Sequence, residues 1–183
     1  MAPRLGAEYI GCFKSRETTT LPGDAAQQPV PVEYAIALRI SGGPFTLADM
    51  DLLLSRVREQ WQNFKPLSRE HGEYVARLNA MIRGVDSKAS PAAITSIKPA
   101  LISIARLSPE AYLVLSVRHY ASAGSAGTIT STKADGTAMV LQGTALVRLE
   151  MLRELRAPSD VDAVRKQITA WAREVAADAG GGR

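Results

Sequence analysis

The sequence predicts a mainly α single domain resembling a four-helix bundle, with a short N-terminal strand, a small β-ribbon or loop and flexible termini. Two segments, 46–64 and the stretch from 159 onward, carry apolar residues at the three-and-four spacing of a buried helix face. With 183 residues and 46% hydrophobic content, the chain can bury one core without needing a second domain. We therefore divide it into an arm (1–31), a helical-bundle domain (32–178) and a tail (179–183).

The N-terminal part is expected to hold little regular structure. Residues 1–31 are polar and proline-bearing, without a period, which is typical of an arm that becomes ordered on a partner. Residues 32–40 then alternate, and the turn at 41–44 ends them. One short strand is predicted there, with one face formed by Tyr34, Ile36, Leu38 and Ile40.

The first two helices are predicted to pair antiparallel. Thr46 can cap the first, with Asp49 at capping-box spacing, and Pro66 stops it. Its apolar stripe is Met50, Leu53, Leu54, Val57, Trp61 and Phe64. The second helix is expected over 68–83, where Gly84 ends it. Its inward residues are Tyr74, Val75, Leu78, Met81 and Ile82.

The middle of the chain is read as helix with open alternatives. Ser90-Pro91 starts a third helix that Lys98-Pro99 kinks or divides. A fourth helical segment is expected over 108–121, although its run of apolar residues also fits a buried strand. Residues 128–132 are rich in hydroxyls and β-branches, which predicts an exposed loop or ribbon.

Two helices are predicted in the C-terminal third. Thr137 can cap one that Ala157-Pro158 ends, while a hairpin about Asp135-Gly136 is the alternative. Its inward residues are Val140, Val147, Met151 and Leu155. The last has Ser159 and Asp162 at capping-box spacing. Its stripe is Val161, Val164, Ile168, Trp171 and Val175.

Charge favours an anionic partner, and the cysteine count favours a reducing compartment. The formal net charge is +4, and 16 arginines against 6 lysines supply guanidinium groups that can bind phosphate with two hydrogen bonds. Cys12 is the single cysteine, so no disulfide can form within the chain. We expect a cytosolic protein without a membrane partner, because neither a signal peptide nor a bilayer-spanning run is present.

Catalytic motifs are poor, so we expect neither an enzyme nor a metal site, cofactor or small-molecule substrate. His71 and His119 belong to different expected elements, and neither has a second histidine or cysteine at metal-ligand spacing. Ser125 misses the first glycine of a nucleophile elbow.

Basic residues near expected helix ends and loops form the main candidate site. Cations at such junctions can follow a phosphate backbone, and the Asp135 carboxylate can accept a hydrogen bond from a ribose 2′-hydroxyl. Each of these residues taken alone is equally well explained as an ordinary solvated surface charge. The RNA-binding interpretation therefore requires that the basic residues lie close together in the folded protein. The cations are Lys65, Arg69, Arg106, Arg118 and Lys133.

The order of features resembles the coat proteins of rod-shaped positive-strand RNA plant viruses, the tobacco-mosaic-like superfamily. Three places carry the resemblance: Gln60-Trp61-Gln62 late in the first helix, Asp135 followed by the segment 147–153, and Trp171 near the C-terminus. The resemblance implies a coat (capsid) subunit, located in the virion and host cytoplasm, that assembles with itself into a helical nucleocapsid around single-stranded RNA. Gln62 and Asp135 match the family's RNA-facing positions. Charge and placement add Lys65, Arg69, Arg106 and Lys133.

A second hypothesis is a non-enzymatic bacterial or phage helical interaction module whose apolar faces make a small closed oligomer. The two differ in symmetry, because a coat subunit grows into discs or rods and a module stops at a fixed number of chains. Light scattering across concentration, pH and ionic strength separates them.

Overall fold

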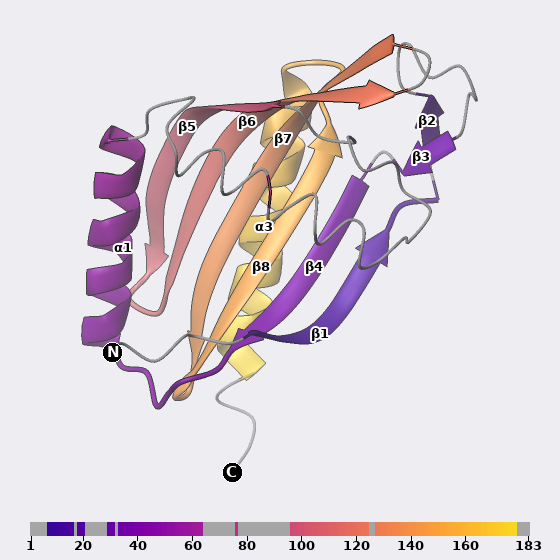
Figure 1. Ribbon diagram of the computed structural model, residues 1–183. Helices are drawn as coiled ribbons and strands as arrows, with labels where there is room; N and C mark the ends of the chain where they lie inside the picture. Colours follow the sequence, from indigo (N-terminus) through magenta and orange to yellow (C-terminus); the bar gives the residue numbers. More distant parts are fainter. Residues whose placement is uncertain are drawn as a thin grey trace.

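The computed structural model describes residues 7–16, 18–20, 29–31, 33–63, 76, 96–124 and 127–178. They form an α+β fold in which one six-stranded antiparallel sheet carries a helix against each face (Figure 1). The strands of the sheet are β1 (Ala7–Lys14), β4 (Glu33–Ile40), β5 (Ser96–Ser108), β6 (Ala111–Gly124), β7 (Gly127–Gln142) and β8 (Ala145–Glu154). The helices are α1 (Leu47–Gln62) and α3 (Ser159–Ala177), and a separate ribbon pairs β2 (Thr18–Thr20) with β3 (Pro29–Pro31).

The strand order is β1-β4-β8-β7-β6-β5. Strands β5 to β8 follow one another as a meander, and β4 then pairs with the last of them, from Glu33 opposite Arg153 to Ile40 opposite Leu146. Strand β4, from the N-terminal part of the chain, therefore lies next to β8, the last strand of the sheet. Among the described strands, β1 and β5 form its two edges.

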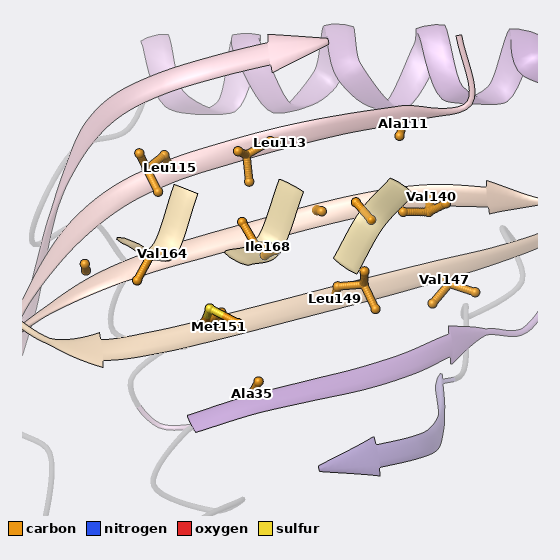
Figure 2. Packing of buried hydrophobic residues seen from close by; sticks show 13 residues of the cluster. Ala35, Ala111, Leu113, Leu115, Val140, Val147, Leu149, Met151, Val164 and Ile168 are labelled. Atoms are coloured by element: carbon orange, nitrogen blue, oxygen red, sulfur yellow. The ribbon is translucent and has the colours of Figure 1, made fainter. Parts of the chain in front are cut away.

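One face of the sheet packs against α3, chiefly over β7 and β8. A row of small residues, Ala134, Gly136 and Ala138, lies on β7 beneath the helix. A Cβ atom at Gly136 would stand 2.9 Å from Cγ1 of Val164, so this glycine allows α3 to approach the sheet closely. Figure 2 shows the aliphatic side chains that complete this core, including Leu113, Leu115, Val140, Val147, Leu149, Met151 and Ile168.

The opposite face packs against α1. Met50 and Leu54 of the helix are buried against a second cluster that contains Tyr112, Val114 and Leu146. Successive residues of a strand point to opposite faces, so Leu113 in the α3 cluster and Val114 in the α1 cluster show that β6 is buried on both sides.

The predicted mainly α, four-helix-bundle-like fold is wrong, because the middle of the chain forms strands. The segment 108–121 lies mostly in β6, so its strand alternative is correct. A strand with helices on both faces loses the polar–apolar alternation that identifies a half-buried strand. Lys98-Pro99, expected to kink a helix, lies within β5, where an edge position tolerates the missing proline amide.

The helix expected after Thr137 is also replaced by strands, β7 and β8. Its inward residues Val140, Val147 and Met151 do lie together, in the α3 core, but on two strands. The alternative prediction of a hairpin is correct, but its turn was placed at the wrong residues. The chain reverses at Gly143-Thr144, where Gly143 has a left-handed φ of 60°, whereas Asp135-Gly136 lies within β7. Residues 128–132 belong to β7 as well. The predicted loop is therefore wrong, and the ribbon alternative is correct.

Three local predictions are confirmed. Residues 33–40 form β4, and the Thr46–Asp49 capping box opens α1, with the Asp49 amide 3.3 Å from the Thr46 hydroxyl. The stripe of α3 packs as expected through Val164 and Ile168. Its cap differs: Pro158 occupies the N-cap without a side-chain hydrogen bond.

The prediction of an unstructured arm at 1–31 is wrong in part, because residues 7–14 form β1. The second helix, 68–83, and the start of the third, 90–95, lie outside the described residues apart from 76, which is helical. Within the part of the chain that the structure describes, no helix is long and apolar enough to cross a membrane.

Candidate functional site

The residues expected to bind RNA lie in separate places. Gln62 is the exposed last residue of α1, whereas Lys65 and Arg69 fall outside the described residues. Arg106 lies on β5, where its guanidinium donates to the Asp51 carboxylate of α1 at 2.6 Å. Only Lys133 and Asp135 lie together, two residues apart on one face of β7.

Lys133 and Asp135 belong to a charged cluster that spans β6, β7 and β8 on the α1 side of the sheet. Each cation of the cluster stands beside a carboxylate. The pairs are Arg118 with Asp135, Lys133 with Glu154 at 3.7 Å, and Arg148 with Glu150. Burial raises the pKa of Asp135, and the Arg118 charge acts in the opposite direction. The three pairs balance, so the cluster presents no net positive charge to a phosphate backbone.

The candidate cations that the structure describes do not form one continuous row along the sheet. Arg106 lies opposite Tyr112 of β6, and Lys133 lies opposite Arg118 of the same strand. Six residues of extended chain separate Tyr112 from Arg118, which is roughly 20 Å. Arg106 therefore lies near one end of the sheet, whereas Lys133 lies near the middle of β7. His119, considered as a metal ligand, lies 2.7 Å from the Thr132 hydroxyl through its Nδ1 atom.

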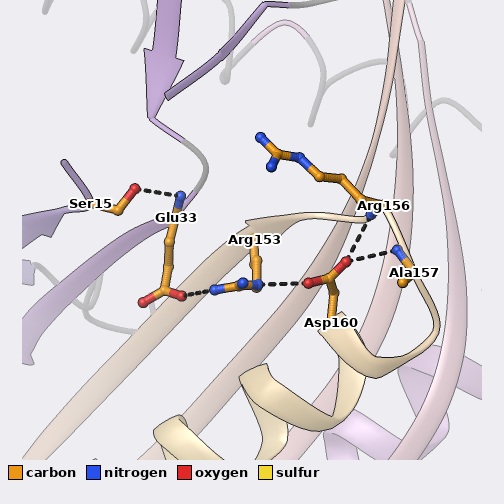
Figure 3. Close-up of polar contacts among 6 residues, drawn as sticks. All are labelled: Ser15, Glu33, Arg153, Arg156, Ala157 and Asp160. Atoms are coloured by element: carbon orange, nitrogen blue, oxygen red, sulfur yellow. Dashed lines mark hydrogen bonds and ion pairs between the residues drawn. The ribbon is translucent and has the colours of Figure 1, made fainter. Parts of the chain in front are cut away.

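A polar chain fixes the start of α3 against β4 and β8 (Figure 3). The Arg153 guanidinium donates to Glu33 at 2.7 Å and to Asp160 at 2.8 Å. Asp160 also accepts from the backbone amides of Arg156 and Ala157. Burial acts to raise the pKa of Asp160, but the hydrogen bonds from Arg153, Ala157 and Arg156 outweigh it and lower that pKa. Asp160 thus fixes the chain just before α3, and the side-chain cap expected from Ser159 is not formed.

The described edge strand β1 exposes large apolar side chains. Tyr9, Ile10 and Phe13 are 57%, 48% and 55% exposed. The pairing with β4 shifts between Tyr9 and Gly11, so a bulge at Ile10 interrupts the strand. Cys12 lies on the same strand, and its hydrogen bond to the Tyr9 hydroxyl is the main cause that raises the pKa of Tyr9 to about 12.

An apolar pocket of about 270 Å³ opens beside β1, on the α3 side of the sheet. Its lining residues are Phe13, Glu33, Ala35, Met151, Gln167 and Trp171. Glu33 is already bound by Arg153, so the remaining walls are mainly hydrocarbon and aromatic. We call this pocket, together with Tyr9, Ile10 and Phe13, the β1 surface.

The sequence contained one signal for this surface that its interpretation missed. Three large apolar residues, Tyr9, Ile10 and Phe13, fall within five positions of a segment assigned to a polar arm. Aromatic and β-branched residues so close together are typical of strands. Trp171 was assigned to the core; it packs beside that core and also lines the pocket.

Comparison with models of known protein families, with curated proteins and with solved structures finds no match for this chain. The fold and the β1 surface therefore carry the functional argument.

Proposed function

We propose that the protein is a non-enzymatic interaction module whose β1 surface binds an extended, apolar segment of a protein chain. The observation that carries the proposal is the exposed Phe13 on the edge strand β1, next to an apolar pocket on the α3 side of the sheet. Phe13 is aligned with Ala35 on that side, whereas Tyr9 is aligned with Leu38 and lies on the α1 side, so the edge exposes apolar side chains on both faces. Large exposed apolar side chains gathered at one edge are typical of an interaction site.

The dimensions of the pocket favour a side chain as its occupant. The pocket, about 270 Å³, is open to solvent at the strand edge beside Phe13, so a side chain can enter it from a segment that lies along the edge. Such an extended segment can place one apolar side chain beside Trp171, while residues further along it contact Ile10.

The bulge at Ile10 limits the backbone hydrogen bonds that a bound segment can make with β1. Bulges at sheet edges limit continuous backbone pairing with another strand. Binding at this surface then depends mainly on side-chain packing, with backbone hydrogen bonds restricted to short stretches on either side of Ile10.

The coat-subunit hypothesis receives less support from the geometry. It requires four bundled helices and one row of cations, whereas β6, β7 and β8 occupy the middle of the domain and Arg106, Arg118 and Lys133 each face a carboxylate. The interaction-module hypothesis requires an apolar surface, which β1 offers. We therefore favour an interaction module, built on a sheet edge and not on the helices that the second hypothesis expected.

Photo-crosslinking from two matched positions tests the proposal. Ile10 and Ile102 are the residues at the pairing shifts of the two edge strands, and they are 48% and 47% exposed. A benzophenone amino acid at position 10 should form adducts with a protein chain, identified by mass spectrometry, at least about ten-fold above position 102. Adducts that are absent from position 10, or equally abundant at position 102, would overturn the proposal.

A further inference from the structure

We infer that the segment bound at the β1 surface carries a lysine that enters the pocket beside Phe13, with its methylene stem against Trp171 and its ammonium group at Glu33. This inference rests on the proposed interaction function and names the side chain that the pocket selects. A lysine side chain is apolar over most of its length, so the inference refines the apolar contact beside Trp171. The register, the charge and the aromatic rings of the pocket support it.

The strand residues that would contact the lysine lie on one face of the sheet. Phe13 is aligned with Ala35, and Glu33 stands two positions before Ala35 on β4. Glu33 is in turn aligned with Arg153 of β8, two positions beyond Met151 in the core beneath α3. Residues two apart on a strand share a face. Strands β1, β4 and β8 therefore present an aromatic ring, a carboxylate and a thioether to the same pocket.

The charge beside the pocket is negative. Arg153 donates to both Glu33, at 2.7 Å, and Asp160, at 2.8 Å. Asp160 also accepts from two backbone amides just before α3, whereas in the described part of the chain the Glu33 carboxylate accepts from Arg153 alone. Two carboxylates thus share one guanidinium in this chain of contacts. One negative charge is left over, and it lies mainly on Glu33.

The Glu33 carboxylate is placed where an incoming cation can meet it. Glu33 lines the pocket, and its side chain is only 9% exposed. Figure 3 shows one carboxylate oxygen directed at Arg153 and the other directed away from it. A carboxylate so far removed from water is stabilised by each further donor that reaches it. An ammonium group beside Glu33 would continue the alternation of charges that runs through Arg153 to Asp160.

The second oxygen of Glu33 favours lysine over arginine. A planar guanidinium binds a carboxylate best through both oxygens at once, and Arg153 already occupies one of them. An ammonium group is a compact point charge that needs only one oxygen.

The walls of the pocket suit the rest of a lysine side chain. Trp171 and Phe13 supply aromatic rings, whose faces attract cations, and Met151 and Ala35 supply apolar surface for the methylene stem. A neutral apolar side chain would contact the same walls without a group for Glu33. An acidic side chain would be repelled by the Glu33 carboxylate.

Two tripeptides that differ at the end of one side chain test the inference. Acetyl-valyl-lysyl-valyl amide carries the ammonium group, acetyl-valyl-norleucyl-valyl amide has a neutral stem of the same length, and the valines favour an extended backbone. Each is titrated into the full chain and followed through the NMR signals of the Trp171 indole and the Met151 methyl group. The lysine tripeptide should bind at least about five-fold more tightly, and this preference should fall as salt is added.

Two variants change the charge of the pocket in opposite directions. Glu33→Gln keeps the length of the side chain and should reduce the preference for lysine to less than about two-fold. Gln167→Glu adds a carboxylate at an exposed lining position and should raise the preference at least about three-fold. Gln62→Glu makes the same change at the exposed end of α1 and should leave the preference unchanged. Circular dichroism checks that each variant is folded, and Gln167→Glu keeps the test decisive if Glu33→Gln is not.

The outcomes separate the lysine inference from the proposed function. Equal binding of the two tripeptides, or a preference that Gln167→Glu does not raise, overturns the lysine inference, while changes in both NMR signals still support an apolar contact. Signals that neither tripeptide changes also overturn the lysine inference. Adducts from position 10 then support the interaction function, and their absence overturns it as well.

Discussion

At the scale of single residues, Gly136 shows how one missing side chain positions a helix. Its neighbours on the same face of β7, Ala134 and Ala138, are fully buried and small, so α3 lies in a shallow channel along the strand. An added methyl group at Gly136 meets Cγ1 of Val164 at 2.9 Å and Cγ2 of Ile168 at 3.2 Å, both closer than ordinary packing allows. The side chains of α3 have little room to yield, because Val164 and Ile168 are themselves fully buried.

Gly136→Ala is therefore expected to lower the free energy of unfolding by about 1–3 kcal/mol, the usual cost of overpacking a core. Chemical denaturation followed by circular dichroism measures the change. Gly11→Ala is the matched control, since a Cβ atom at that strand glycine meets nothing within 4 Å. It should change stability by less than about 0.5 kcal/mol. Equal effects at the two positions would contradict the close approach of α3.

The residue scale also explains how far the candidate site could be predicted. Lys133 and Asp135 stand two positions apart in the sequence, and this spacing on a strand places them on one face. Lys133 pairs with Glu154, 21 residues away, and Asp135 pairs with Arg118, 17 residues away, so pairing depends on strand register. Strand register depends on residues far apart in the sequence. The sequence therefore showed which residues are charged, but not that each of these cations lies beside a carboxylate.

At the scale of elements, local signals predicted the helices and missed most strands. The capping box at Thr46 and the stripe of Val164 and Ile168 depend on residues within one or two turns, which a sequence displays directly. The β4 strand was found because its alternation is intact. In contrast, Leu113-Val114-Leu115 is buried on both faces, and a short apolar run of this kind has no period that separates strand from helix.

At its first turn, α3 is attached to the sheet by Asp160 as well as by its apolar stripe. Asp160 accepts from Arg153 at 2.8 Å and from the Ala157 amide at 2.8 Å, and Arg153 continues to Glu33 on β4. The carboxylate thereby joins the helix to two strands beside the pocket that Glu33 lines.

Asp160→Asn should cost about 1–2 kcal/mol at neutral pH, because the charge-assisted bond to Arg153 is weakened. The folded state holds the pKa of Asp160 below its ordinary value of 3.8, so its contribution is present above that value and lost as the pH falls through the folded pKa. The stability difference between wild type and variant should therefore shrink under acid conditions. Denaturation at a series of pH values checks this dependence.

Asp162→Asn is the matched control for the same helix turn. Its carboxylate is 72% exposed and meets only Arg165, three residues along the helix, among the contacts described. The expected change is within about 0.5 kcal/mol. A pH-independent deficit for Asp160→Asn would show that the loss arises from helix packing and would contradict the ionic attachment.

At the scale of the whole molecule, the two edges of the sheet are unequal. Both described edge strands have a pairing shift with an exposed isoleucine, Ile10 on β1 and Ile102 on β5. In the described part of the chain, β1 lies beside the pocket that Trp171 lines, whereas β5 contacts α1 through the Arg106–Asp51 pair. Pro99 also removes one backbone donor from β5. The unequal surroundings of the two edges thus leave β1 as the edge suited to association.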